Sequence, residues 1–270
     1  MDTIQLGGIQ LSRFILGSNP FSGFSHQSPE TDLQMKRWFT VQRIKDTLRE
    51  AESLGVNTLM ARADHHMGRL LLEHWDEGGK IQWFAQTCPE IGPTEHGARQ
   101  AIAGGANACH IHGGVMDHLL AQGNLDEVPR AIEIIREAGL LAGIAGHDPE
   151  VFRWAEANLA VDYYMCSYYN SMRRDRHPEH VSGATEWFHG EDRKVMTELI
   201  QTLSKPVIHY KVMAAGRNDP AQAFAYVAKN LRPQDAVCVG VYPEHHPGML
   251  RENVELFESS LADMPLFQNQ

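Results

Sequence analysis

The chain has 270 residues, of which 43% are hydrophobic, and it carries a formal net charge of −10 at pH 7. The acidic balance argues against a nucleic acid as partner, because a phosphate backbone is bound by a basic protein face. The apolar content is enough for a sizeable core, yet no apolar run approaches the ~20 residues that span a bilayer, so we expect no membrane segment.

The chain begins with MDTIQLGGIQ, which lacks the basic-then-apolar pattern of a secretory signal peptide. Its four cysteines are widely spaced, without the paired spacing of a metal site, and we expect them to be reduced core residues. Together these features predict a cytoplasmic protein, and they leave its oligomeric state open.

Short apolar runs alternate with segments of helical periodicity along the whole chain. We expect strands at residues 13–18, 57–61, 81–87, 108–112, 141–146, 162–167, 206–212 and 236–241. Between the first two, Val41, Ile44 and Leu48 recur at three- and four-residue steps, and Gly55 ends the helix. Eight such strand–helix units without a break in composition predict one (β/α)8 TIM barrel that forms a single domain over residues 1–270.

The predicted loops differ in length at the two ends of the strands. The connections from helix to strand are short, whereas the strand-to-helix loops at residues 19–39 and 168–190 are long. In a TIM barrel the active site is built from the loops that follow the strands. We therefore expect an enzyme that acts on a small-molecule substrate, and a catalytically inactive ligand-binding barrel is the alternative.

Histidines follow several of the predicted strands. They are His65, His66, His110, His112, His147 and His209. Because the carboxyl ends of the strands meet at one face of a barrel, these residues can share one cavity, and imidazole titrates near neutral pH. The side chains that we expect to carry catalysis are His112, Lys211, His65 and Asp64.

Imidazoles and carboxylates at neighbouring strand ends also predict a divalent metal site, for Zn²⁺ or Mn²⁺. The expected ligands are His112, His147, Glu90 and His209, with His65 as a substitute. Such an ion keeps one coordination position open for water or substrate, and it polarises a carbonyl or activates water. This predicts lyase, isomerase or hydrolase chemistry. The alternative is a hydrogen-bonded histidine cluster without an ion.

The seventh predicted strand leaves its own orientation open. His209 and Lys211 share one face, and Ile208 and Tyr210 share the other. Because the helix-facing side of a barrel strand is normally apolar, this pattern favours His209 and Lys211 pointing inward. A lysine there binds an anion, polarises a carbonyl or forms a Schiff base.

Two long loops hold candidate substrate contacts. Residues 173–177, Arg-Arg-Asp-Arg-His, are either a clamp for a carboxylate or phosphate or a solvated loop. Tyr168, Tyr169 and Asn170 suit a polyhydroxylated ligand. Residues 19–26 hold two phenylalanines and end in a histidine, which predicts a lid. We therefore expect an anionic or polyhydroxylated substrate.

Segments in matching order resemble the aldo/keto reductase family over most of the chain. LREAESLGVNTLMARADHH is similar to the family's second strand region, and NACHIHGG to its fourth strand with the catalytic histidine. PVIHYKVMAAGR is similar to the seventh strand, and VCVGVY followed by RENVELF to the eighth strand and the cofactor helix. The resemblance implies a TIM barrel and nicotinamide-dependent carbonyl reduction, with His112 catalytic and Tyr210 as an aromatic wall for the cofactor ring.

The chain departs from the family at the positions that carry its chemistry. Met60, His65 and Cys88 stand where the resemblance implies Asp, Tyr and Lys. The residues at the implied amide- and phosphate-binding positions are Ala145, Gly146 and Met249. These replacements argue against ordinary hydride transfer and favour the metal-assisted interpretation. A divergent NAD(P)H-dependent reductase, with His112 and His65 as acid groups, is the alternative.

Overall fold

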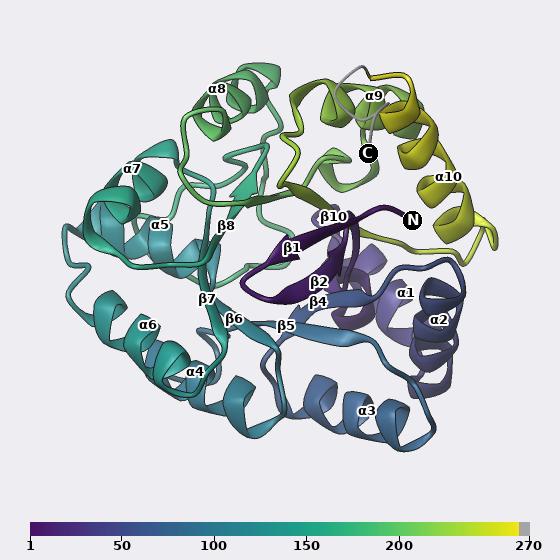
Figure 1. The fold of residues 1–270 in the computed structure, drawn as a ribbon, viewed down its shortest axis with the longest axis horizontal. Helices are drawn as coiled ribbons and strands as arrows, with labels where there is room; N and C mark the ends of the chain where they lie inside the picture. Colours follow the sequence, from purple (N-terminus) through teal and green to yellow (C-terminus); the bar gives the residue numbers. More distant parts are fainter. Residues whose placement is uncertain (265–270) are drawn as a thin grey trace.

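The computed structural model describes residues 1–264, in which eight parallel strands close into a barrel (Figure 1). The barrel strands are β3 (Phe14–Gly17), β4 (Thr58–Arg62), β5 (Gln82–Gln86), β6 (Ala108–Ile111), β7 (Leu141–Gly146), β8 (Tyr163–Ser167), β9 (Val207–Tyr210) and β10 (Ala236–Gly240). The ring closes where β10 pairs with β3, with Val237 opposite Phe14. The predicted (β/α)8 TIM barrel is confirmed.

Helices surround the barrel on its outer side (Figure 1). They are α1 (Pro29–Trp38), α2 (Val41–Ser53), α3 (His65–Asp76), α4 (Thr94–Ala103), α5 (Gly113–Gln122), α6 (Glu127–Glu137), α7 (Pro149–Asn158), α8 (Gly190–Ile200), α9 (Pro220–Asn230) and α10 (Met249–Ala262). In α2 the predicted apolar positions Ile44 and Leu48 are fully buried, and Thr40 caps the first turn. No helix within residues 1–264 is both long and apolar enough to cross a membrane.

Residues 19–39, expected to be a loop, contain a short 3₁₀ helix, η1 (Asn19–Ser22), and the helix α1. Helix α1 forms here because the Ser28 side chain accepts a hydrogen bond from the Thr31 backbone N–H and Pro29 occupies the first turn. The remaining loop between η1 and α1 brings His26 over the barrel.

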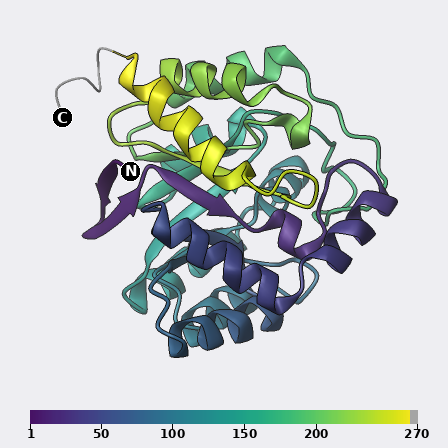
Figure 2. The same ribbon diagram turned by 90° about the vertical axis from the view of Figure 1, so that its right-hand side faces the viewer.

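A hairpin of β1 (Thr3–Leu6) and β2 (Ile9–Ser12) closes one end of the barrel, and Figure 2 shows it at the end opposite to α1. Gly7 and Gly8 form its two-residue turn with φ of 52° and 89°, as a type I′ turn requires. The hairpin residues Ile4, Leu6 and Leu11 pack in one cluster with the inward-facing barrel residues.

The alternation of side chains along β9 corrects one prediction. Ile208 and Tyr210 belong to the cluster inside the barrel, whereas His209 is fully buried on the helix-facing side. There its Nδ1 lies 3.0 Å from the Tyr168 hydroxyl and its Nε2 lies 3.3 Å from Asp235. These partners satisfy both ring nitrogens of His209, so this polar side chain is tolerated on the helix-facing side of the strand. The expected inward orientation of His209 is therefore wrong.

Candidate active site

A cavity of about 460 Å³ opens at the carboxyl ends of the barrel strands. Its floor contains inward-facing residues of four strands, namely Met60, Met165, Tyr210 and Cys238. From there it extends to the start of α10, where its lining residues are Met249, Glu252 and Asn253. Its volume falls in the range of small-molecule sites, and its apolar floor with a few polar groups is typical of them.

Lys211 supplies a buried amine to this cavity. It follows the last residue of β9 with a φ of 56°, so the chain leaves the strand alternation and the side chain reaches the barrel mouth. Its Nζ donates a hydrogen bond to the Ser171 hydroxyl at 3.1 Å and lies 3.8 Å from the Glu186 carboxylate. Burial, opposed by the charge of Glu186 and reinforced by that of Arg174, lowers the pKa of Lys211 to about 8.

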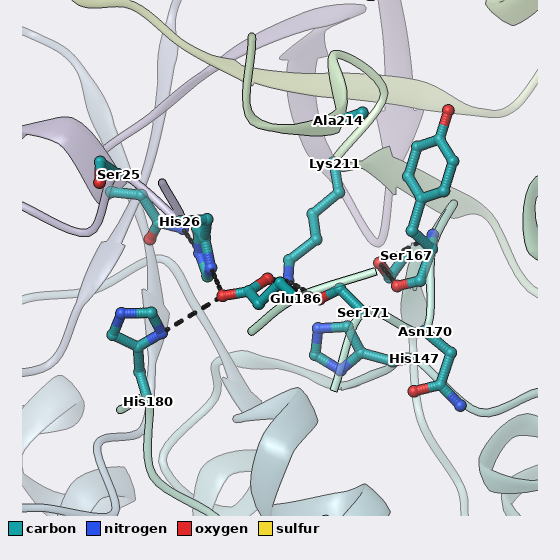
Figure 3. Close-up of polar contacts among 12 residues, drawn as sticks. Ser25, His26, His147, Ser167, Asn170, Ser171, His180, Glu186, Lys211 and Ala214 are labelled. Atoms are coloured by element: carbon teal, nitrogen blue, oxygen red, sulfur yellow. Dashed lines mark hydrogen bonds and ion pairs between the residues drawn. The ribbon is translucent and has the colours of Figure 1, made fainter. Parts of the chain in front are cut away.

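Glu186 joins two loops above the barrel mouth (Figure 3). Its Oε1 lies 2.6 Å from Nδ1 of His26 and 3.8 Å from Nδ1 of His180, while its Oε2 accepts from Ser171 at 2.7 Å. Burial alone would raise the pKa of Glu186, but the hydrogen bond from His26 and the charge of Lys211 hold it well below the usual range. Burial and the charge of Lys211 lower the pKa of His26 to about 4, so its ring is neutral at pH 7.

His147, Asp117 and Tyr210 form a chain of polar contacts beneath that cluster. Asp117 Oδ2 lies 2.6 Å from Nδ1 of His147, and Nε2 of His147 lies 3.2 Å from the Tyr210 hydroxyl. Asp117 Oδ1 also accepts hydrogen bonds from the backbone N–H groups of His147 and Asp148. With Asp117 accepting from Nδ1, the other ring nitrogen is free to accept from the phenol.

Two arginine side chains, Arg174 and Arg62, lie near the mouth. Within residues 173–177, Arg174 alone is buried, and its guanidinium donates to the backbone oxygens of Pro178 and Glu179. Burial and the positive charge of Arg174 hold the pKa of His112 well below its ordinary value. Arg62, which also lines the cavity, carries a further positive charge and pairs with Asp64 and Glu90.

The structure gives the other predicted catalytic residues local roles. The Asp64 carboxylate caps α3 by accepting from the Met67 backbone N–H, which turns His65 toward solvent. The expectation that His65 faces the cavity is therefore wrong. His112 caps α5, where its Nδ1 accepts from the Gly114 backbone N–H at 3.1 Å, and it is absent from the cavity lining.

The predicted metal ligands His112, His147, Glu90 and His209 do not converge on one point. His147 uses Nδ1 for Asp117, Glu90 pairs with Arg62 at 3.0 Å, and His209 lies on the helix-facing side of β9. Within the described residues 1–264, the group of ligating side chains with metal-like spacing is instead His26, His180 and Glu186. Of these three residues, His26 belongs to the segment 19–26 that the sequence predicts to be a lid. No local sequence pattern indicates that Glu186, His180 or Asp117 belongs to the site.

No family model and no curated protein matches the chain. Solved structures match over nearly its whole length. The holo form of the aldo-keto reductase AKR11C1 from Bacillus halodurans has a TM-score of 0.63 at 14% identity, covering 99% of this chain and 94% of that chain. MGS-M4, an aldo-keto reductase from a Medee basin deep-sea metagenome library, has a TM-score of 0.52 at 9% identity, covering 100% and 99%.

A truncated 3-deoxy-D-arabino-heptulosonate 7-phosphate synthase from Thermotoga maritima also matches, with a TM-score of 0.58 at 15% identity, covering 97% of this chain and 92% of that chain. Enzymes of two different reaction classes thus share this architecture with the chain. At such identities the likeness shows the fold alone, which is an aldo-keto reductase-like TIM barrel.

Proposed function

We propose that the chain is a nicotinamide-dependent oxidoreductase that reduces the carbonyl group of a small anionic substrate. The observation that carries this proposal is the extent of the cavity, which runs from Tyr210 at the barrel mouth to Glu252 and Asn253 on α10. A space of this shape suits an elongated ligand with a flat ring at its inner end. The fold shared with aldo-keto reductases supports the same function, and the metal ligand set expected from the sequence is not assembled.

The cavity offers contacts for a dinucleotide near Tyr210 and near α10, but two positions that the family resemblance implies as anchors are apolar. Tyr210 is partly exposed in the cavity and offers a ring face, and Glu252 and Asn253 offer polar groups at the adenosine end. Ala145 and Met249 offer no polar partner for an amide or a phosphate. We therefore expect modest affinity and little discrimination between NADH and NADPH. When bound, the reduced nicotinamide supplies a hydride.

The residues of the chain then handle the charge that develops on the substrate oxygen. Lys211 lines the cavity, and its ammonium group is held by Ser171 and Glu186. An ammonium group in a water-poor site polarises a carbonyl and donates a proton to its oxygen as negative charge grows. Arg174 lies outside the cavity lining, but its positive charge acts on Lys211 and His112, and we expect that charge to favour a substrate with a carboxylate or phosphate.

The Asp117–His147–Tyr210 chain positions the aromatic wall of the cavity. Asp117 holds the imidazole in one orientation, and the imidazole in turn holds the phenol at 3.2 Å. A ring fixed at its hydroxyl presents one face to the cavity, which orders a flat ligand beside it.

The test is a titration of the purified chain with NADH and NADPH, followed by assays with small 2-oxo acids and aldehydes. We expect saturable binding in the micromolar range and a slow but measurable reduction. Lys211→Met should lower kcat by about 10²–10⁴-fold, the usual contribution of a proton donor, with little change in cofactor Kd. Lys194→Met, an exposed lysine on α8, is the matched control. Failure of both cofactors to bind at millimolar concentration would overturn the proposal.

A further inference from the structure

Three potential metal ligands converge from two loops above the barrel mouth. His26 comes from the loop between η1 and α1, and His180 and Glu186 come from the loop between β8 and α8. One ligand atom of each lies within 4.8 Å of the others, although His26 and Glu186 are 160 positions apart in the sequence. Figure 3 shows both imidazole rings directed at the same carboxylate.

The two oxygens of Glu186 face different partners. Oε1 faces the nitrogens of His26 and His180, at 2.6 Å and 3.8 Å. Oε2 faces the Ser171 hydroxyl at 2.7 Å and the Lys211 amine at 3.8 Å. A cation between the imidazoles and Oε1 is therefore separated from the lysine by the carboxylate itself, and the carboxylate screens the two positive charges from each other.

Two further observations indicate that an ion belongs at this point. Nδ1 of His180 is buried and has no hydrogen-bond partner, and such atoms often mark a missing water or ion. In addition, His26 has a φ of 56°, and a strained non-glycine backbone of this kind is concentrated at functional sites.

We propose that His26, His180 and Glu186 bind one divalent transition-metal ion, best matched by Zn²⁺, with a fourth position left for water or substrate. Two imidazoles and one carboxylate are a ligand set that zinc uses in open sites. His26 binds through Nδ1 as a neutral imidazole, so its ring proton moves to Nε2 and no proton is released. The Asn19 side chain, 3.4 Å from Nε2 of His26, then orients the ring from behind.

The ion links the β8–α8 loop, which carries His180 and Glu186, to the η1–α1 loop, which carries His26. It thereby stabilises the position of both loops above the barrel mouth. A second contact lies next to this one, since the Ser182 hydroxyl of the β8–α8 loop donates to the carboxylate of Asp32 in α1. This metal site is distinct from the one that the sequence predicted, and it does not depend on nicotinamide binding.

The experiment uses the full chain, purified without an affinity tag and freed of metal by a chelator. Zn²⁺ alone is titrated against a chromophoric chelator, and Co²⁺ is used as a spectroscopic probe of tetrahedral coordination. We expect about one ion per chain with a Kd below about 1 μM. Glu186→Gln and His180→Asn should each weaken binding by more than the roughly 10- to 100-fold that a supporting hydrogen bond contributes.

Two control variants locate the ion. Lys211→Met alters only the Oε2 side and should retain it, and His245→Ala/His246→Ala removes an exposed histidine pair that could capture zinc adventitiously. Zinc should also slow hydrogen exchange of backbone amides in residues 168–189, a readout that needs no activity. The proposal is overturned if the His245/His246 variant loses the ion, or if His180→Asn keeps full affinity while folded by circular dichroism. Neither result bears on nicotinamide binding.

Discussion

Asp117 is a single buried carboxylate that organises the interior wall of the cavity. It accepts hydrogen bonds from the imidazole of His147 and from two successive backbone N–H groups. A neutral amide cannot replace it, because only one of its two terminal atoms is an acceptor. The orientation of Tyr210 therefore depends on a residue that does not itself line the cavity.

We expect Asp117→Asn to lower the free energy of unfolding by about 1–3 kcal/mol, because buried donors lose their acceptor. Urea denaturation followed by circular dichroism measures this. Asp126→Asn, at an exposed position before α6 whose side chain makes no capping hydrogen bond, is the control and should stay within about 0.5 kcal/mol of the parent. An unchanged midpoint in the Asp117 variant would contradict the assigned hydrogen bonds.

At the scale of elements, α10 decides what the outer end of the cavity can bind. The helix begins at Met249, which lines the cavity together with Glu252 and Asn253. The positive end of a helix dipole favours an anion there, but the first position carries a thioether. The first position of α10 is thus apolar, although a positive charge at that position would stabilise a bound phosphate.

Met249→Arg should raise the affinity for NADPH about tenfold, the effect of one charge-assisted hydrogen bond to a phosphate. Fluorescence titration of the cofactor gives the Kd. Leu72→Arg, at an exposed position of α3, adds the same charge far from the cavity and should leave the Kd unchanged. An equal gain in both variants would indicate a nonspecific charge effect and would count against a cofactor at α10.

For the molecule as a whole, Asp235 joins the last two barrel strands to their flanking loops. It is fully buried, and it accepts from the Val207 backbone at 2.8 Å, from the Arg232 guanidinium at 2.8 Å and lies near His209. Burial alone would raise the pKa of Asp235, but His209 and Arg232 hold it below the ordinary value of 3.8. The carboxylate therefore stabilises the fold at pH values above 3.8, and this contribution is lost as the pH falls through the folded pKa.

We expect Asp235→Asn to cost about 3–5 kcal/mol at pH 7, because the charge of Arg232 loses its buried partner. We expect the stability of the parent to decline below pH 4, and the variant should lose part of this decline. Thermal and urea unfolding between pH 3 and pH 7 test both expectations. Asp76→Asn, an exposed residue that ends α3, should reproduce the parent curve. A parallel acid decline in parent and Asp235 variant would contradict this assignment.

The barrel could be predicted from the sequence because its signals are local. Each strand is a short apolar run and each helix a periodic one, so all eight units appear in order. The orientation of β9 could not be predicted. The prediction placed His209 inward because a polar side chain on the helix-facing side was expected to lack partners, but Asp235, 26 positions away, is such a partner. The Glu186–His26 contact spans 160 positions and has no local signature at all. Site residues that depend on such long-range partners emerge only from the fold.

The β1–β2 hairpin has a consequence for the order of events at the site. Because it packs into the barrel from the end opposite to the cavity, it leaves the carboxyl ends of the strands as the side from which a ligand reaches the site. Two ligands that enter from the same side cannot exchange places inside the cavity. For the proposed cofactor and substrate, we therefore expect compulsory-order kinetics, in which the molecule at the inner position binds first and leaves last.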